Sequence, residues 1–139
     1  MTHLWGISRT DIEGMWPRVE NLVAAACSSS QLHSPDGIKS DLANGISQLW
    51  IAWEGSVDDI IVRACLVTKI EKSPIAQWCR GILVAGNKPD DWFDHIETIE
   101  KWAKDKGCGK MNFIGRCGLE HWLKPKGYQR THFLMEKAI

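Results

Sequence analysis

Residues 77–115 read QWCRGILVAGNKPDDWFDHIETIEKWAKDKGCGKMNFIG, and this stretch decides the fold. Its first part, residues 77–85, is rich in apolar and β-branched side chains, which predicts a strand. Residues 90–106 repeat apolar side chains at helical spacing and end at Gly107, which predicts a helix. The short apolar segment at residues 111–115 predicts a buried strand. A strand, a helix and a strand in this order form a crossover, so we expect the two strands to pair in parallel.

Two helices are expected before the crossover. Residues 10–26 place apolar side chains at helical spacing, with Thr10 as the N-cap. Pro17 lies inside this segment, where a proline costs about 3 kcal/mol. The helix is therefore predicted to kink after Glu13 or to restart with Pro17 at its first position. A second, shorter helix is predicted from residue 35 or 36 to Asn44.

The remaining segments predict strands and one short helix. A strand precedes the first helix, and residues 48–54 and 60–70 have strand character. Together with the strand that opens the crossover, they predict an antiparallel meander. Residues 118–124 are expected to form a short helix and residues 131–136 a last strand. The order is therefore β-α-α-β-β-β-α-β-α-β, in a single α+β domain that spans residues 1–139.

Composition limits the classes of function. The 139 residues include 17 basic and 17 acidic side chains, and 44% are apolar, as in a globular protein rather than a disordered one. A net charge of zero gives no overall attraction to nucleic acid or to an anionic membrane. No apolar run approaches the roughly 18 residues that span a membrane. The last 39 residues are basic, with nine basic against three acidic side chains, so nucleic acid remains the weaker alternative.

The cysteines argue against disulfides and against structural zinc. There are five cysteines, an odd number, and they are scattered along the chain. The first residues do not resemble a secretion signal. Cys108, Cys117 and His121 could be considered as metal ligands, but the chain has no pair of cysteines at the spacing that zinc sites use. We therefore predict no metal, and reduced thiols as in a cytoplasmic protein.

Two segments carry a family resemblance: EKWAKDKGC at residues 100–108 and KPKGY at residues 124–128. They resemble the GNAT superfamily of acyl-CoA-dependent N-acyltransferases. A compact GNAT-like group found among bacteriophage proteins is similar in five segments, at residues 16–17, 48–50, 99–103, 115–116 and 124–128. The resemblance covers nearly the whole chain and implies a GNAT fold with acetyl-CoA between the two parallel strands. It also implies acetyl transfer to the amine of a small molecule or protein, in the host cytoplasm if the chain is phage-encoded.

The resemblance also implies where the cofactor binds. In the superfamily a glycine-rich turn before the long helix holds the pyrophosphate with its backbone N–H groups. That turn falls on residues 87–92 here and keeps none of the glycines, while Pro89 removes one donor. The implied cofactor-binding residues are Leu83, Val84, Ala85, Lys88, Asp90, Asp91 and Trp92. Because two carboxylates lie where phosphates are expected, a second interpretation stays open. It is a catalytically inactive GNAT-fold phage protein that binds another protein, as a virion component or in host interaction.

Two residues are candidates for proton transfer. Glu54 ends the first meander strand, near where superfamily members often place the base for the acceptor amine; the alternative is a solvated turn carboxylate. Leu123 occupies the position of the tyrosine that protonates the leaving thiolate in many members. Tyr128, the only tyrosine, is therefore the candidate acid, with packing as the alternative. Arg80 either meets a phosphate or an acidic substrate, or points outward.

Eight tryptophans are unusually many for this length. Trp50 and Trp53 are three residues apart in one predicted strand, so they must point to opposite faces of the sheet. At least one of them is then covered by a helix or exposed. An exposed tryptophan patch would indicate a protein partner or a homodimer.

Overall fold

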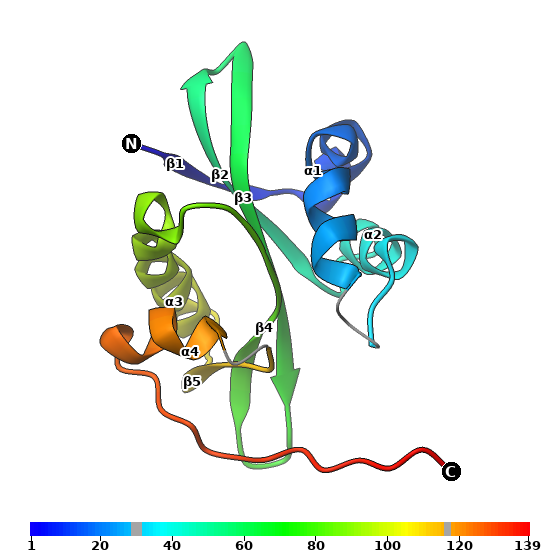
Figure 1. Cartoon of the computed structure of the whole chain (residues 1–139), viewed down its shortest axis with the longest axis vertical. Coiled ribbons are helices and arrows are strands. Elements are labelled where there is room, and N and C mark those ends of the chain that lie inside the picture. Colours follow the sequence, from blue (N-terminus) through cyan, green and yellow to red (C-terminus); the bar gives the residue numbers. More distant parts are fainter. Residues whose placement is uncertain (29–31, 116–117) are drawn as a thin grey trace.

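In the computed structural model, five strands form one mixed sheet with helices on both faces (Figure 1). The structure describes residues 1–28, 32–115 and 118–139. The strands are β1 (His3–Ile7), β2 (Gln48–Ser56), β3 (Asp59–Lys72), β4 (Gln77–Gly86) and β5 (Lys110–Phe113), in that order across the sheet. Neighbours pair antiparallel except β4 and β5, which pair in parallel. The predicted α+β class, meander and parallel crossover are confirmed.

The helices separate into two pairs. Figure 1 shows α1 (Ile12–Cys27) and α2 (Pro35–Ala43) on one side of the sheet. On the other side lie α3 (Ile96–Asp105) and α4 (Gly118–Leu123), the latter extended by a 3-10 turn, η4 (Lys124–Lys126). Within the described ranges, no helix has the length and apolar character needed to cross a membrane.

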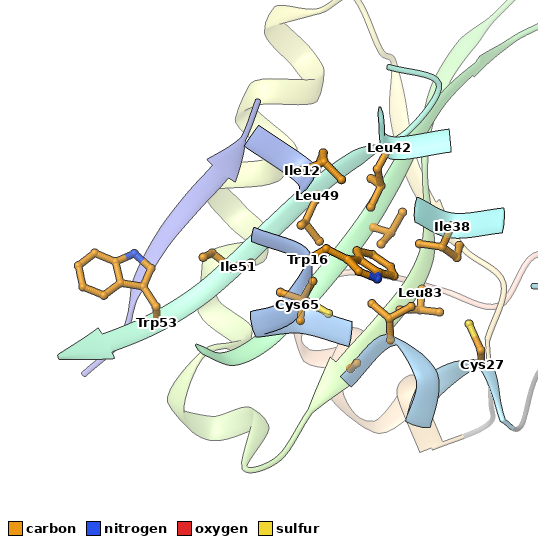
Figure 2. Close-up of a cluster of buried hydrophobic side chains, with 14 of the residues drawn as sticks. Ile12, Trp16, Cys27, Ile38, Leu42, Leu49, Ile51, Trp53, Cys65 and Leu83 are labelled. Atoms are coloured by element: carbon orange, nitrogen blue, oxygen red, sulfur yellow. The ribbon is translucent and has the colours of Figure 1, made fainter. Parts of the chain in front are cut away.

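The larger core cluster lies between the sheet and the pair α1 and α2 (Figure 2). Its most buried large side chains are Ile12, Val19, Val23, Leu42, Leu49, Ile51 and Val67. Each side chain of this size contributes about 1.5–3 kcal/mol when fully removed from water. The alternation of Leu49 and Ile51 in β2 explains why this face of the strand is apolar throughout.

The two strand tryptophans lie on opposite faces, as predicted. Trp53 joins the α1-side cluster and packs against Trp5, with 4.3 Å between ring centroids. Trp50 meets Trp102 of α3 edge to face at 5.0 Å, and its Nε1 donates to the buried Thr68 hydroxyl at 3.0 Å. All eight tryptophans are at least partly buried, so the chain has no exposed tryptophan patch and that argument for a partner fails.

The first helix begins later than predicted. A 3-10 turn, η1 (Arg9–Asp11), precedes it, and Asp11 rather than Thr10 occupies the N-cap position. The Thr10 hydroxyl instead shares a hydrogen bond with the Ser8 hydroxyl at 3.1 Å. The Thr10 hydroxyl therefore bonds to a neighbouring side chain and makes no side-chain cap of α1.

Pro17 neither ends nor restarts α1, which is one helix through this residue. The proline costs the hydrogen bond that its N–H would have donated to the Glu13 carbonyl. Its neighbours Trp16 and Val19 are 6% and 0% exposed, so packing on the sheet offsets that loss. The predicted helix ends at Asn44-Gly45 and Gly107 are confirmed, because Gly45 and Gly107 have φ of 73° and 91°.

The long predicted helix is shorter than residues 90–106. Two 3-10 turns, η2 (Pro89–Asp91) and η3 (Phe93–His95), replace its first two turns. They are separated by Trp92, whose φ of −141° is incompatible with a continuous α-helix. The Trp92 indole N–H donates to the Asn87 carbonyl at 2.7 Å and stabilises this conformation.

The predicted last strand at residues 131–136 is wrong for the single chain. These residues have no secondary structure and are exposed. A strand is stable only when its backbone pairs with a neighbour, and here the segment extends past the sheet without running along β5 (Figure 1). The strand-like composition is present, but this chain by itself gives the segment no partner.

We expect Gly86→Ala to lower the free energy of unfolding by about 1–3 kcal/mol, because it strains the backbone and creates a clash. Gly86 has a φ of 144°, and a Cβ there would lie 2.8 Å from the Arg63 carbonyl oxygen and 2.6 Å from the Ala64 Cβ. The matched control is Gly14→Ala in α1, where a Cβ meets nothing within 4 Å. This control should raise stability by about 0.5–1 kcal/mol. Urea denaturation followed by tryptophan fluorescence measures both, and equal effects would contradict the expectation.

Candidate functional site

The central feature of the site is an opening between β4 and β5. The two strands pair only from Trp78 opposite Lys110 to Gly81 opposite Phe113. Beyond this point β5 ends while β4 continues to Gly86. In the described part of the chain, no strand pairs with residues 82–86 on the side that faces β5. The backbone groups on this edge are therefore open to a ligand.

A bulge in β4 lies at the start of the opening. Thr68 of β3 is opposite Gly81 and Val67 is opposite Leu83, so Ile82 has no partner across β3. A bulge bends the strand locally and changes the direction of its side chains. The predicted cofactor residues Leu83, Val84 and Ala85 follow directly and line the open edge. The structure thus brings these three residues together on one edge of β4.

The aromatic ring of Phe113 closes the base of the opening. A Cβ added to Gly81 would lie 2.0 Å from Phe113 Cε1, so the ring packs directly on the glycine backbone. Only glycine allows this approach at the last paired position. The sequence signal for this contact is a glycine inside an otherwise apolar strand.

An apolar cavity adjoins the opening on the α3 side of the sheet. Its empty volume is about 400 Å³, including space open to solvent. Val84 of β4 and Phe113 of β5 both line it, which links it to the opening. Trp50, Phe93 and Ile99 form other parts of its wall. The lining residues are almost all apolar, so the cavity offers few polar partners.

The backbone of the turn at residues 87–92 forms hydrogen bonds within the turn. The N–H groups of Asp91 and Trp92 donate to the carbonyls of Lys88 and Pro89 at 3.0 and 3.1 Å. Lys88 has a left-handed backbone with φ of 52°, and Asp90 and Asp91 are both exposed. Two amides that could hold an anion are therefore already used, and two carboxylates lie beside them.

The N-terminal segment holds this turn in place. The buried Thr2 hydroxyl donates to the Asp91 carbonyl at 2.8 Å. Its oxygen lies 2.9 Å from His95 Nε2, so this nitrogen must be the donor of the pair. Thr2 thus connects the start of the chain to both 3-10 turns and limits how far the turn can rearrange.

A polar cluster, made of Glu71, Arg80 and Asn112, lies at the base of the opening on the opposite face. Arg80 Nε is 3.2 Å from Asn112 Oδ1 and 3.0 Å from Glu71 Oε1. Trp78 Nε1 donates to the same Glu71 oxygen at 3.0 Å. The cluster faces away from α3, because the alternating residue Cys79 packs against that helix.

The polar cluster is partly open to solvent and partly unpaired. The side chains of Arg80 and Glu71 are 29% and 28% exposed. Among the described residues, Glu71 Oε2 and the two terminal nitrogens of Arg80 have no hydrogen-bond partner. The sequence leaves the role of Arg80 open and does not single out Glu71, because their contact runs diagonally across the β3–β4 hairpin.

Glu54 lies far from the base of the opening. It pairs with Arg63, which donates from Nε at 2.6 Å and from Nη2 to the same carboxylate oxygen. Glu54 is opposite Ile61, whereas Gly81 is opposite Thr68. At about 3.3 Å per residue, these seven positions along β3 correspond to roughly 23 Å. The structure does not bring Glu54 to the polar cluster, and its role as base stays a prediction.

Tyr128 is engaged by α3. Its hydroxyl donates to Glu100 Oε2 at 2.5 Å, and its ring packs edge to face on Phe113 with 5.6 Å between centroids. Burial, together with the Glu100 carboxylate, raises the pKa of Tyr128 well above its ordinary value. The phenol is therefore a weaker acid than usual, and its role as general acid stays a prediction.

The described cysteines are buried thiols. Cys27, Cys65, Cys79 and Cys108 form no disulfide, and Cys117 lies outside the described residues. Burial raises the pKa of Cys65 to about 12 and that of Cys79 to about 11, so both remain protonated. In the ranges that the structure describes, no group of three side chains that could hold a metal ion occurs. The set considered from the sequence, Cys108, Cys117 and His121, includes Cys117, which lies outside these ranges.

Comparison with known proteins identifies the fold. No protein-family model and no curated protein matches the sequence. Among solved structures, a probable acetyltransferase superposes with a TM-score of 0.72 at 7% identity, over 99% of this chain and 96% of that one. A predicted acetyltransferase with acetyl-CoA from Clostridium acetobutylicum gives 0.67 at 15% identity, over 99% and 96%. A ribosomal-protein-alanine N-acetyltransferase from Brucella melitensis gives 0.67 at 10% identity, over 100% and 98%. The chain has the GNAT fold.

We expect the four described thiols to be unreactive in the native protein, because all four are buried and inaccessible to a reagent in solution. In a Cys117→Ser variant, a colorimetric disulfide reagent at pH 8 should label no thiol within minutes. After unfolding in guanidinium the same variant should release four equivalents. Rapid labelling of any native thiol would contradict this assignment.

Proposed function

We propose that this protein is an acyl-CoA-dependent N-acyltransferase that transfers an acetyl group to an amine. The observation that carries the proposal is the opening between β4 and β5, where residues 82–86 present an unpaired backbone edge. The GNAT fold is shared with solved acetyltransferases, one of which contains acetyl-CoA. An opening with a polar cluster at its base could position a donor and an acceptor together.

The two ends of acyl-CoA fit this site differently. The thioester arm fits, because the open edge of β4 offers backbone donors and acceptors along an extended ligand. The diphosphate does not fit the turn at residues 87–92, where the amides of Asp91 and Trp92 are engaged and Asp90 and Asp91 are negative. Affinity should therefore come from the arm rather than from the diphosphate.

The chain's own residues supply proton transfer and acceptor binding. Acyl-CoA, when bound, supplies the acyl group as an activated thioester. Glu71 Oε2, which has no hydrogen-bond partner among the described residues, takes the proton that the attacking amine loses as the amide bond forms. The carbon–sulfur bond of the thioester breaks in this exchange, and the CoA thiolate leaves and takes up a proton from solvent. The terminal nitrogens of Arg80 bind a carboxylate on the acceptor, so we infer an acceptor with an acidic group near its amine.

Calorimetry with two donors tests the proposed fit. We expect acetyl-CoA and S-acetylpantetheine to bind with dissociation constants within about threefold, because the diphosphate gains no amide contacts. Changing Asp90→Asn and Asp91→Asn together should tighten acetyl-CoA about tenfold by removing two like charges. The same change should leave S-acetylpantetheine unaffected. Absence of binding heat for both donors at millimolar concentration would refute the proposal.

Two matched carboxylate variants test the base. We expect Glu71→Gln to lower kcat/KM for acetyl transfer about a hundredfold at neutral pH, since it removes the proton acceptor. Glu54→Gln carries the same chemical change at a distance from the opening and should leave the rate nearly unchanged. The opposite result would assign the base to Glu54, as the sequence resemblance implies. Circular dichroism of both variants controls for folding.

One observation favours a second candidate function, the inactive phage-type binding protein. In the turn at residues 87–92, the amides of Asp91 and Trp92 donate to carbonyls of the same turn, and Thr2 hydrogen-bonds to the Asp91 carbonyl. In this conformation these two amides are not available to a diphosphate. A protein that no longer uses the donor would tolerate this change. Binding of neither donor, together with a stable complex with one defined host protein, would support this candidate instead.

A further inference from the structure

The apolar cavity on the α3 side of the sheet lies over a row of small residues that crosses the strands. Ala52 of β2 is opposite Ala64 of β3, and Ala64 is opposite Gly86 of β4. Both alanines line the cavity. The next row on the same face carries the large side chains of Trp50 and Leu66. The cavity therefore results from three neighbouring positions at which the side chain is at most one methyl group.

The opposite wall of the cavity comes from η3 and α3. Phe93, Ile96 and Ile99 line it and are all buried. Side chains in a protein interior normally interdigitate and leave few spaces larger than a water molecule. The volume of about 400 Å³ includes space open to solvent, so a ligand can enter this cavity from outside.

The ring N–H groups of the lining side chains donate to acceptors outside the cavity wall. The Trp50 indole N–H donates to the Thr68 hydroxyl at 3.0 Å. Trp92 and His95 likewise donate to a backbone carbonyl at 2.7 Å and to a threonine hydroxyl at 2.9 Å. A bound water molecule needs two to four polar partners, and with these donors engaged the cavity suits a hydrocarbon better than water.

The cavity meets the opening between β4 and β5. Val84 belongs to the open edge of β4, Phe113 closes the base of the opening, and both side chains line the cavity. The polar cluster, which includes Glu71 and Arg80, lies at the same base on the opposite face of the sheet. A thioester at this base would therefore receive the amine from the polar face and extend its acyl chain toward the apolar face.

We propose that this cavity holds the acyl chain of the donor, and that the preferred donor carries a linear saturated chain of about six to eight carbons. This assignment rests on the proposed acyltransferase function and changes only the acyl group, so the bonds that form and break stay the same. Acetyl thioesters remain donors of lower affinity, because a single methyl group leaves most of the apolar wall without a contact.

The width of the sheet sets the length of the chain. Ala52 on β2 lies two strands away from Val84 on β4. Neighbouring strands are about 4.8 Å apart, which gives roughly 10 Å across the sheet. An extended chain advances about 1.2 Å per bond, so about eight bonds reach from the open edge to Ala52. Each methylene that leaves water for this wall should raise affinity about fourfold.

Calorimetry with S-acetylpantetheine and S-hexanoylpantetheine tests the assignment on the wild-type protein. Four added methylenes would give about 250-fold if all were fully buried, and ordering the chain takes back part of this gain. We therefore expect S-hexanoylpantetheine to bind about fiftyfold more tightly. A gain below about tenfold overturns the preferred chain length, and binding and transfer from acetyl donors would then leave the proposed function intact. Absence of binding heat with every donor overturns both.

A variant that fills the cavity separates binding inside it from adhesion of the chain to the surface. Ala52→Val should raise the dissociation constant of S-hexanoylpantetheine about tenfold and change that of S-acetylpantetheine less than about twofold, because only the longer chain reaches Ala52. Ala103→Val is the matched control, since Ala103 is equally buried in α3 but is not a lining residue. It should leave the ratio of the two constants unchanged. An unchanged ratio in Ala52→Val overturns the proposal.

The heat capacity change of binding gives a readout that needs no variant. Burial of apolar surface makes this change more negative. In the wild-type protein we expect it to become more negative from S-acetylpantetheine through S-butyrylpantetheine to S-hexanoylpantetheine, because each added methylene is buried. Equal values for the three donors would place the chain in solvent and overturn the proposal, even where Ala52→Val does not fold. Urea denaturation of both alanine variants controls for folding.

Discussion

The packing of the Phe113 ring on the backbone of Gly81 is the contact on which the candidate site depends. It occupies the last position where β4 and β5 pair, and beyond it the strands part. A side chain on residue 81 would overlap the ring, so glycine is required there. The apolar cavity lies on one side of this pair and the polar cluster on the other, and Tyr128 rests on the same ring. The opening, the apolar cavity, the polar cluster and Tyr128 therefore all lie around this one contact.

The site is asymmetric in its chemistry. Toward α3 it is apolar, whereas the opposite face carries Glu71 and Arg80 with unused hydrogen-bonding atoms. The turn at residues 87–92 adds two exposed carboxylates but few free amides. This arrangement suits an extended thioester arm and a charged acceptor better than it suits a diphosphate. A chain with zero net charge can thus have a strongly polarised site, because the balance holds only over the whole sequence.

Local patterns explain which predictions succeeded. The crossover from residue 77 to residue 115 was predicted because a strand period, a helix period and a glycine stop follow each other there. The N-cap prediction at Thr10 was wrong, and its hydroxyl hydrogen-bonds to the Ser8 hydroxyl instead. The long helix of the crossover begins at Ile96 rather than at residue 90, because the hydrogen bond from the Trp92 indole to the Asn87 carbonyl stabilises a non-helical backbone there. Glu71 was missed because its contact with Arg80 crosses between two strands and depends on the register of the β3–β4 hairpin, which the local sequence pattern of either strand does not contain.

The sequence by itself determined the α+β order as far as α4, the parallel crossover and the opposite orientation of Trp50 and Trp53. These features follow from periodicities of 3.6 and 2 residues. Only the tertiary structure decided where β4 and β5 part, which carboxylate reaches the base of the opening, and that residues 131–136 lack a partner. These features depend on residues far apart in the chain. Strand pairing and side-chain contacts across the sheet are settled by register and packing, which no local window of sequence contains.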